Sequence, residues 1–563
     1  METLDWLIVL VLNGSIVLWG LHIGRSTKST ADWFLAAKHL PWWIVGFSLF
    51  ATAIDSSDFV AIMGGSYQLG MSNITMWWIG LPLGWFLVSY VIIVPLYRSG
   101  LYTNAEYLEY RFGPSARLLS AFIQFQQRTN VLGNVAFSLF LVFSTLTGWG
   151  KMGSWTFVVG IALVAAVYTA VGGLKSVAIT DSVQSILMII ATLILFGIVW
   201  FEIGGWTGLE SRLAAKDPAL VEKLMHVGGS NPEGVPTLLL LFGLTVSLTA
   251  YCVINQSQAM RLLGARSEWD LRTAALVASV LTVLVMGCNI SLGVLGHGLF
   301  PDLQQADQVY PRMLKEYLGV GVMGLVVSGL LAGAISTYDS VGSSVSAVLT
   351  RDVYARFLVK HREDHHYLRV SRILTVAVIV MSFGYIPFLE GGMVRFYLRL
   401  SAVAVIPLFT VYLMGVLTRV HRKSGTIGLI VGMGYGLSAF LGEQWGLPFL
   451  WTNIWWSYLW GTLITGGAMV TTSLVSGWES KENIAALLYQ RSPDFSTHVP
   501  EKSEEIHPAE ETKETWLETS RKSAPRPNFE TDRAHTRPWY NQPTIWYVLF
   551  MIIVATINFV VLW

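Results

Sequence analysis

Charged residues and cysteines are both scarce in this chain. Only 13% of its 563 residues are charged, whereas 53% are hydrophobic, and the mean hydropathy is +0.53. This composition excludes an ordinary soluble globular protein and predicts one that crosses a membrane many times. A net charge of +1 argues against the basic surface that binds nucleic acid. Cys252 and Cys288 both lie in apolar runs, so no disulfide framework is expected.

Residue patterns typical of enzymes are also missing. No nucleophile, metal cluster or phosphate-binding loop stands out, and the histidines fall mostly in loops, so we expect no catalytic activity. The chain begins with Met1-Glu2-Thr3-Leu4-Asp5, which is acidic where a secretory signal is basic. We therefore expect the first apolar run to remain in the protein as a membrane span.

Fourteen apolar runs are long enough to cross a membrane as helices. They lie near residues 5–23, 42–66, 75–97, 118–147, 154–171, 178–203, 236–258, 270–299, 316–348, 368–391, 395–418, 424–441, 450–476 and 543–563. The segment 478–541 differs from them, because it is rich in Glu, Lys, Ser and Pro. We expect it to be a disordered cytoplasmic linker, for which a regulatory or partner-binding role stays open.

The distribution of lysine and arginine between the spans predicts that the N-terminus lies outside the cell. With this orientation the outer loops hold only Lys151, Arg212, Lys216, Lys223, Arg312 and Lys315. The inner loops hold many more, among them Arg25, Arg98, Arg111, Arg117, Lys175, Arg261, Arg266, Arg272, Arg351, Arg356, Arg419 and Arg422. Because cytoplasmic loops carry an excess of Lys and Arg, this orientation is favoured, and an even number of spans puts the C-terminus outside as well.

The stretch Gly329 to Asp352 places oxygen atoms on one face of an apolar helix. Ser336, Asp339, Ser340 and Ser343 recur at i, i+3, i+4 and i+7. A carboxylate inside a membrane is costly unless it meets a cation or a polar partner, which indicates a functional site. The alternative is a helix-packing seam, since small residues precede this face: Gly329, Ala332, Gly333 and Ala334.

Two predicted spans are interrupted by polar residues. The second contains Asp55, Ser56, Ser57 and Asp58 in a row, which indicates a helix broken near mid-membrane whose freed carbonyls can bind a cation. The two acids could also cap the second half-helix. A comparable defect, Tyr251 to Gln258, interrupts the seventh span before Arg261 at the expected inner surface. Two broken spans five positions apart are typical of an inverted repeat of five plus five helices.

A further acid enters the membrane at the start of the sixth span. Gly172 and Gly173 predict a tight turn, and Asp181 and Gln184 then follow on one helical face. Asp181 could be an acid of the first turn that the helix dipole stabilises, or it could have a specific partner.

Four of these motifs together resemble the sodium/solute symporter family, which includes sodium-coupled sugar, proline and sialic acid transporters. They are GGLKSVAITDSVQ, YCVINQSQAMRLLGA, DQVYP (Asp307 to Pro311) and GLLAGAISTYDS. The resemblance implies an all-α membrane protein with a LeuT-like fold of two inverted five-helix repeats. The implied regions are an extra N-terminal helix and cytoplasmic loop (1–41), a ten-helix transport core (42–418), two extra spans (419–477), the linker (478–541) and a C-terminal span (542–563).

The same resemblance implies a principal sodium site between the first broken helix and the Ser336 helix. Its ligands would be Ala51, Ile54, Gly333, Ser336 and Thr337, the first three through their carbonyl oxygens. Some members of the family have a second sodium site, whose matching residues here are Asp181, Ser336, Asp339 and Ser340. Asp339 replaces a hydroxyl of the family pattern, so we expect one sodium ion and consider two plausible.

For the solute, the resemblance implies a site near Arg128, Asp58, Tyr251 and Arg399. Arg128 lies about 16 Å into its span at 1.5 Å per residue, and sialic acid transporters place an arginine on this helix to hold a carboxylate. A permanent ion pair with Asp55 or Asp58 is the alternative. Tyr251 matches an aromatic inner gate. Arg399 stands where sugar transporters have a glutamine, although its side chain could equally reach the membrane surface.

We therefore expect a sodium-driven symporter in the plasma (cell inner) membrane, which imports a small polar solute by alternating access. The charged positions favour a carboxylate-bearing solute, either an acidic sugar or an organic acid. The alternatives are a neutral sugar symporter, a substrate sensor that does not transport, and a carrier coupled to protons. The expected partners are the solute, sodium and the lipid bilayer, with no nucleic acid and no obligate protein partner.

Overall fold

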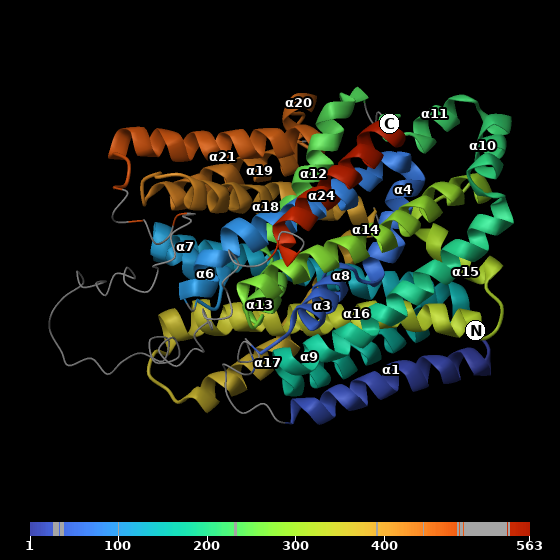
Figure 1. Cartoon of the computed structure of the whole chain (residues 1–563), viewed down its shortest axis with the longest axis horizontal. Coiled ribbons are helices and arrows are strands. Elements are labelled where there is room, and N and C mark those ends of the chain that lie inside the picture. Colours follow the sequence, from blue (N-terminus) through green and yellow to red (C-terminus); the bar gives the residue numbers. More distant parts are fainter. Residues whose placement is uncertain are drawn as a thin grey trace.

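The computed structural model describes residues 1–25, 33, 39–99, 101–229, 234–389, 392–442, 444–480, 484, 488, 538 and 541–563. These residues form helices and no strand. Most of the long helices run along the long axis of the molecule (Figure 1). Nearly all of the predicted linker 478–541 lies outside the described residues.

The long helices coincide with the predicted spans. Within the described part of the chain, eleven helices are long and apolar enough to cross a membrane, and twelve if one bent pair counts as a span. One of the eleven, α9 (Lys151–Ile203), covers two predicted spans that are joined by a kink at Gly173, whose φ is 69°. A further predicted span coincides with α21 (Ile454–Ser476). The predicted number of fourteen is thus approximate.

The other helices follow the order of the predicted spans. They are α1 (Thr3–Gly24), α3 (Trp42–Ala53), α4 (Met63–Leu69), α5 (Leu81–Leu87), α6 (Ile93–Ser99), α7 (Asn104–Phe112), α8 (Pro114–Thr147), α10 (Gly205–Lys216), α11 (Ala219–Met225), α12 (Thr237–Ile254), α13 (Gln256–Leu263), α14 (Glu268–Leu299), α15 (Val309–Tyr317), α16 (Val322–Val348), α17 (Asp364–Ser382), α18 (Met393–Leu417), α19 (Ser424–Gly442), α20 (Phe449–Thr452) and α24 (Pro543–Thr556).

Both predicted helix breaks are present. Helix α3 ends at Ala53, the backbone is extended at Ile54, and a π-helical turn, Asp58–Ile62, leads into α4. The two halves of this span meet at an angle of 60°. Helix α12 ends at Ile254 and α13 begins at Gln256. Because the N–H of Asp55 donates to the carboxylate of Asp58, the first break leaves the carbonyl of Ala51 free of the helical hydrogen-bond pattern.

Helix α16 lies at the centre of the molecule and packs along α9 (Figure 1). The approach is close, because a Cβ atom added at Gly329 would lie 2.4 Å from the Cβ of Ala191. A Cβ at Gly333 would lie 3.5 Å from the Cα of Asp55, so the same small residues bring the first break against α16. The packing seam and the oxygen-rich face are both features of this one helix.

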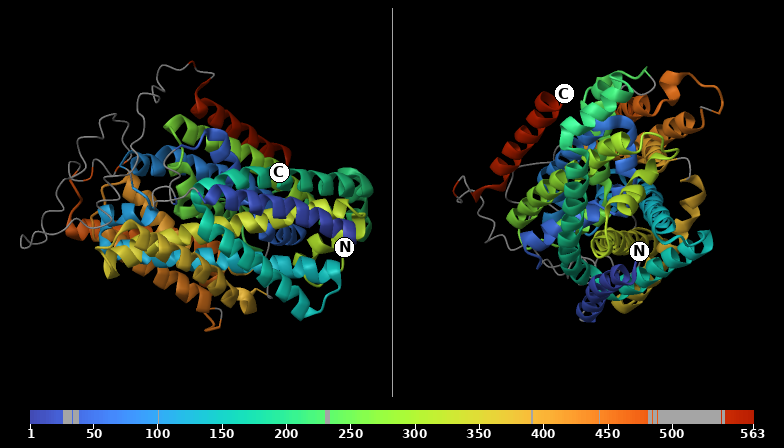
Figure 2. Two further views of the ribbon diagram at one scale, coloured as in Figure 1. Left: turned by 90° about the horizontal axis from the view of Figure 1, so that it is seen from below. Right: turned by 90° about the vertical axis from the view of Figure 1, so that its right-hand side faces the viewer.

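The C-terminal helix α24 lies on the outside of the bundle (Figure 2). The hydroxyl of Tyr547 attaches it there by donating to the carbonyl of Pro82 at 3.0 Å, and it lies 2.6 Å from the hydroxyl of Ser279. The last residues meet the α11 region, where Val227 N donates to Leu562 O at 2.7 Å.

Candidate functional site

The first helix break is closed by a reciprocal pair of aspartates. Oδ1 of Asp55 accepts hydrogen bonds from the backbone N–H groups of Ser57 at 2.7 Å and Asp58 at 3.2 Å. In return, Oδ2 of Asp58 accepts from the N–H of Asp55 at 2.9 Å. This is the geometry of a capping box, so the predicted capping role of the two acids is confirmed. Capping leaves the carbonyls that precede the break available to a cation.

The second break is capped in the same way by Asn255. Its Oδ1 accepts from the N–H of Ser257 at 3.0 Å and from that of Gln258 at 3.4 Å. Asp55 and Asn255 thus each accept from the residues two and three positions further on. This shared cap geometry is what two copies of one repeat would place at corresponding positions.

The residues of the predicted principal sodium site come from α3 and α16, which meet at the first break. Oγ of Ser336 lies 3.1 Å from the carbonyl oxygen of Ala51, and Gly333 packs against the chain next to Ile54. The neighbouring hydroxyl of Thr337 is buried and has no hydrogen-bond partner among the described residues. Carbonyl and hydroxyl oxygens are the donors that a hard cation prefers, so this set of residues fits a sodium ion.

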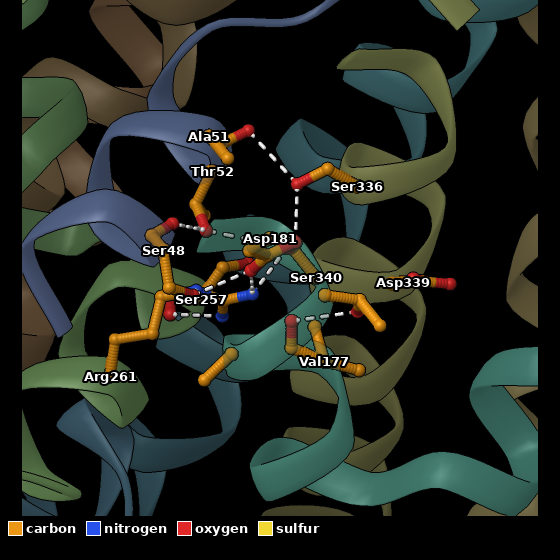
Figure 3. Close-up of polar contacts among 12 residues, drawn as sticks. Ser48, Ala51, Thr52, Val177, Asp181, Ser257, Arg261, Ser336, Asp339 and Ser340 are labelled. Carbon is orange, nitrogen blue, oxygen red and sulfur yellow. Dashed lines mark hydrogen bonds and ion pairs between the residues drawn. The ribbon is translucent and has the colours of Figure 1, made fainter. Parts of the chain in front are cut away.

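Next to this site, the guanidinium of Arg261 occupies the centre of the predicted second cation site. Nη2 of Arg261 lies 3.0 Å from Oδ2 of Asp181 and also donates to the hydroxyl of Ser340. Its Nε donates to Ser48 Oγ at 2.9 Å, and Ser336 Oγ donates to Asp181 Oδ1 at 2.7 Å. Figure 3 shows these side chains converging from α3, α9, α13 and α16. The protein itself therefore supplies a cation at this position.

Asp339 does not join this group. Figure 3 shows its carboxylate directed away from Asp181, and its Oδ1 accepts a hydrogen bond from the hydroxyl of Thr169 on α9. Of the four residues expected at a second sodium site, the structure brings Asp181, Ser336 and Ser340 together and separates Asp339 from them.

The expected surface position of Arg261 is wrong. Its side chain is fully buried, because α13 packs against α3, α9 and α16, and its guanidinium reaches Asp181. The sequence left open whether Asp181 is stabilised by the helix dipole or by a specific partner. The structure shows specific partners, because Arg261 and the hydroxyls of Ser48 and Ser336 contact this carboxylate. Arg261 could have been suspected from the sequence, because several acids inside the predicted spans require a buried base.

A cavity of about 50 Å³ lies beside the first break. Asp55 and Asp58 form part of its wall, together with the aromatic rings of Trp77, Tyr251 and Tyr397. Its other lining residues are Ala53, Ser57, Ala61, Ile62, Met76, Val131, Asn134, Leu248, Met393 and Val394.

Arg128 lies next to this cavity, with its guanidinium stacked on the ring of Tyr251 at 4.4 Å from the ring centroid. The side chain is buried, and its Nη2 has no hydrogen-bond partner among the described residues. Within that part of the chain, no ion pair joins Arg128 to Asp55 or Asp58. The charge of Arg128 nevertheless acts on the carboxylate of Asp55, so the permanent ion pair stays a prediction. Arg399 is half-buried on α18 and does not line the cavity.

A half-buried carboxylate connects the loop before α15 to the wall of the cavity. Asp307, in the 3₁₀ turn Ala306–Gln308, accepts a hydrogen bond through Oδ2 from the N–H of Met393 at 3.3 Å, at the start of α18. Burial raises the pKa of Asp307 to about 6. A Cβ added at Gly64 would lie 2.6 Å from the other oxygen of this carboxylate, so Gly64 leaves room for it against α4.

A cluster of ion pairs fastens the opposite end of the core. Nη1 of Arg117 lies 2.5 Å from Oε2 of Glu109, and its Nη2 lies 2.5 Å from Oδ1 of Asp352. Nη2 of Arg356 lies 2.6 Å from Oε1 of Glu109. Burial alone would raise the pKa of Glu109, but hydrogen bonds and charges from Arg356 and Arg117 outweigh it and hold the pKa below its usual range. The cluster joins α7 to α8 and to the π-helix Leu349–Leu358 that follows α16. None of its members was expected at a functional position.

Residues 33–432 match the model of the sodium:solute symporter family. The chain belongs to this family. It is 26% identical over 463 residues to the sodium/glucose cotransporter of Vibrio parahaemolyticus, over 77% of this chain and 84% of that protein. It is 27% identical to the sodium/myo-inositol cotransporter 2 of Rattus norvegicus, over 78% and 70% of the two chains.

The fold of this family member is also that of a solved transporter. The structure of a Na⁺-coupled sialic acid symporter in a substrate-bound outward-open state matches it with a TM-score of 0.72, over 85% of this chain and 99% of that one. The identity is 18%, so this likeness concerns the fold alone. The expected LeuT-like fold is confirmed. This symporter is an integral multi-pass membrane protein, a transporter rather than an enzyme, and it couples a solute to sodium.

Proposed function

We propose that this symporter imports a carboxylate-bearing organic solute, an acidic sugar or an organic acid, together with sodium by alternating access. One observation carries the proposal: Arg128 is buried beside the cavity with an unpaired Nη2. Leaving a buried guanidinium nitrogen without a partner is costly, and a carboxylate can accept a charge-assisted hydrogen bond from it. Asp58 and Tyr251 contribute to the same site.

For sodium, we propose one ion per transport cycle, bound by Ala51, Ile54, Gly333, Ser336 and Thr337. The unpaired hydroxyl of Thr337 and the contact between Ser336 and Ala51 support this site. A second ion at Asp181 and Ser340 would have to displace the guanidinium of Arg261. We further propose that the protein resides in the plasma membrane with its N-terminus outside.

The experiment is ligand-induced stabilisation of the purified protein, followed by uptake into vesicles. Acidic sugars, organic acids and neutral sugars are each tested in sodium and in potassium. A ligand at a hundred times its Kd stabilises the folded state by about 2.7 kcal/mol, which raises the melting temperature visibly. We expect acids to do so in sodium only, and Arg128→Ala to abolish the shift. Uptake that ignores a sodium gradient would contradict the proposal.

A sodium-coupled neutral sugar symporter is the second candidate. The names of the relatives favour it, since they are cotransporters of glucose and myo-inositol. The aromatic rings of Trp77, Tyr251 and Tyr397 could also stack on a sugar ring. Stabilisation by glucose or myo-inositol that survives Arg128→Ala would select this function.

A further inference from the structure

We propose that the solute moves between the cavity and one end of the core along a single face of α8, on which Gln124 and Gln127 line its path. The end in question is the one at which Arg117 forms its ion pairs. The inference concerns the route through the protein and holds for whichever solute the cavity binds. It starts from two glutamine side chains that are buried without being fully hydrogen-bonded.

The helical repeat of α8 defines this face. Val131 and Asn134 line the cavity. Gln127 and Gln124 precede Val131 by four and seven positions, so they lie on the same face, about one and two turns nearer the ion pairs. Arg117 lies fourteen positions before Val131, which corresponds to about 21 Å at 1.5 Å per residue. The face therefore connects the cavity with that end of the core.

The amide groups on this face are only partly satisfied. Nε2 of Gln127 donates to Oγ of Ser401 on α18 at 3.2 Å, and Nε2 of Gln124 donates to Oγ of Ser120 at 3.2 Å. Both side chains are buried, and their Oε1 atoms have no hydrogen-bond partner in the part of the chain that the structure describes. An unpaired buried amide oxygen is unfavourable, and an apolar side chain would avoid it. These oxygens can accept hydrogen bonds from water or from a polar solute once the face opens.

The path is closed at its far end in this conformation. The ring of Tyr412 on α18 stacks on the ring of Tyr107 on α7, with 6.1 Å between the ring centroids. The ion pair between Arg117 and Glu109 holds α7 to α8. The same conformation brings the proposed sodium ligands of α3 and α16 together. Sodium that binds there stabilises the closed path by mass action.

Reaction of introduced cysteines with a water-soluble, positively charged methanethiosulfonate reagent tests the path. The background is the full chain with Cys252→Ala and Cys288→Ala, to which Gln124→Cys or Gln127→Cys is added. We expect both positions to react about 10-fold more slowly in sodium, at ten times its Kd, than in potassium. No reaction at either position in either salt would overturn the proposal.

Thr129→Cys is the matched control. Thr129 is as deeply buried on the same helix, but its side chain lies on the opposite face, where its hydroxyl donates to Tyr385 Oη at 3.3 Å in the 3₁₀ turn Phe383–Phe388. We expect no reaction at this position in sodium or in potassium. Similar reaction rates at all three positions would show that α8 loosens as a whole, which would also overturn the proposal.

Uptake into vesicles distinguishes a path for the solute from a crevice that only water enters. Reaction of Gln124→Cys should abolish uptake of any compound that stabilises the protein, and it should leave the stabilisation itself intact, because the cavity lies about two turns away. Unchanged uptake after complete reaction would refute the path, and loss of the stabilisation would place the adduct in the cavity instead. The cysteine reactions need no solute, so they decide this inference even if the proposed carboxylate solute is wrong.

Discussion

Arg261 and Asp181 form an ion pair of 3.0 Å in the interior of the transporter, although 80 positions separate them in the sequence. Both side chains are almost completely buried. The pair holds α13, which follows the second break, against α9. Arg261 also donates to Ser340 on α16, the helix that carries Gly333, Ser336 and Thr337 of the proposed sodium site. Any movement of α13 relative to α9 must therefore break or carry the ion pair.

Removing one member of the pair should be much worse than removing both. Arg261→Gln leaves Asp181 as a buried charge without a cation, and we expect a loss of about 3–5 kcal/mol in stability. The double variant Asp181→Asn, Arg261→Gln should lose less than the sum of the two single variants. Thermal unfolding of the four proteins in detergent measures the coupling. Additive losses would show that the two residues act independently.

The same variant tests how many sodium ions bind. We propose that the guanidinium of Arg261 prevents a cation from binding between Asp181 and Ser340. Without it, sodium can compensate the carboxylate, so Arg261→Gln should recover stability steeply as sodium is raised. We expect a Hill coefficient near one for sodium in the parent protein and a higher value in the variant. An unchanged sodium dependence would count against the proposal that Arg261 replaces a second ion.

Thr337 provides the most direct test of the principal sodium site. Its hydroxyl is buried and unpaired in the described structure, so Thr337→Ala removes a proposed ligand without breaking a hydrogen bond. We expect the apparent affinity for sodium to fall about 10-fold, equal to about 1.4 kcal/mol, and Thr337→Ser to restore it. The control is Ser343→Ala on the same helix, since that hydroxyl donates to carbonyls of its own helix. Equal losses from both alanine variants would refute the site.

The helix break at Asp55 could be predicted from the sequence, whereas the buried position of Arg261 could not. Polar residues that interrupt an apolar run reveal a break locally, and the breaks at Asp55 and Asn255 were both predicted on that basis. Arg261 could not be placed in this way. A cation at the end of an apolar run is equally compatible with the membrane surface, and only the packing of α13 against α3, α9 and α16 places it inside. The direction of Asp339, away from Asp181, depends in the same way on how α16 is rotated against α9.

The caps at the two breaks should contribute similarly to stability. Asp55→Ala and Asn255→Ala each remove a side-chain oxygen that accepts two backbone N–H groups, which costs about 0.5–2 kcal/mol at a helix N-terminus. Asp55→Asn keeps an acceptor at the same position and should lose much less. Thermal unfolding of the three variants checks this. A loss in Asp55→Asn as large as in Asp55→Ala would show that the charge of Asp55, and not its cap, stabilises the break.

Asp307 predicts a dependence of stability on pH. Its pKa is raised to about 6 in the folded protein, against about 3.9 in an unfolded chain. Between these values the folded state holds a proton that the unfolded state has released, so its contribution to stability falls as the pH rises. Above pH 6 the buried carboxylate costs about 3 kcal/mol, from about two pKa units at 1.36 kcal/mol each.

Asp307→Asn should remove this cost, because the amide is neutral at every pH and keeps an oxygen for the N–H of Met393. We expect the variant to be more stable than the parent protein at pH 8 and no more stable at pH 4, where Asp307 is protonated. Melting temperatures measured across this range check the prediction, with the exposed Asp302→Asn as the control. A gain in stability that does not depend on pH would mean that the substitution acts through packing against Gly64. Such a result would contradict the prediction that the ionisation of Asp307 lowers the stability of the protein above pH 6.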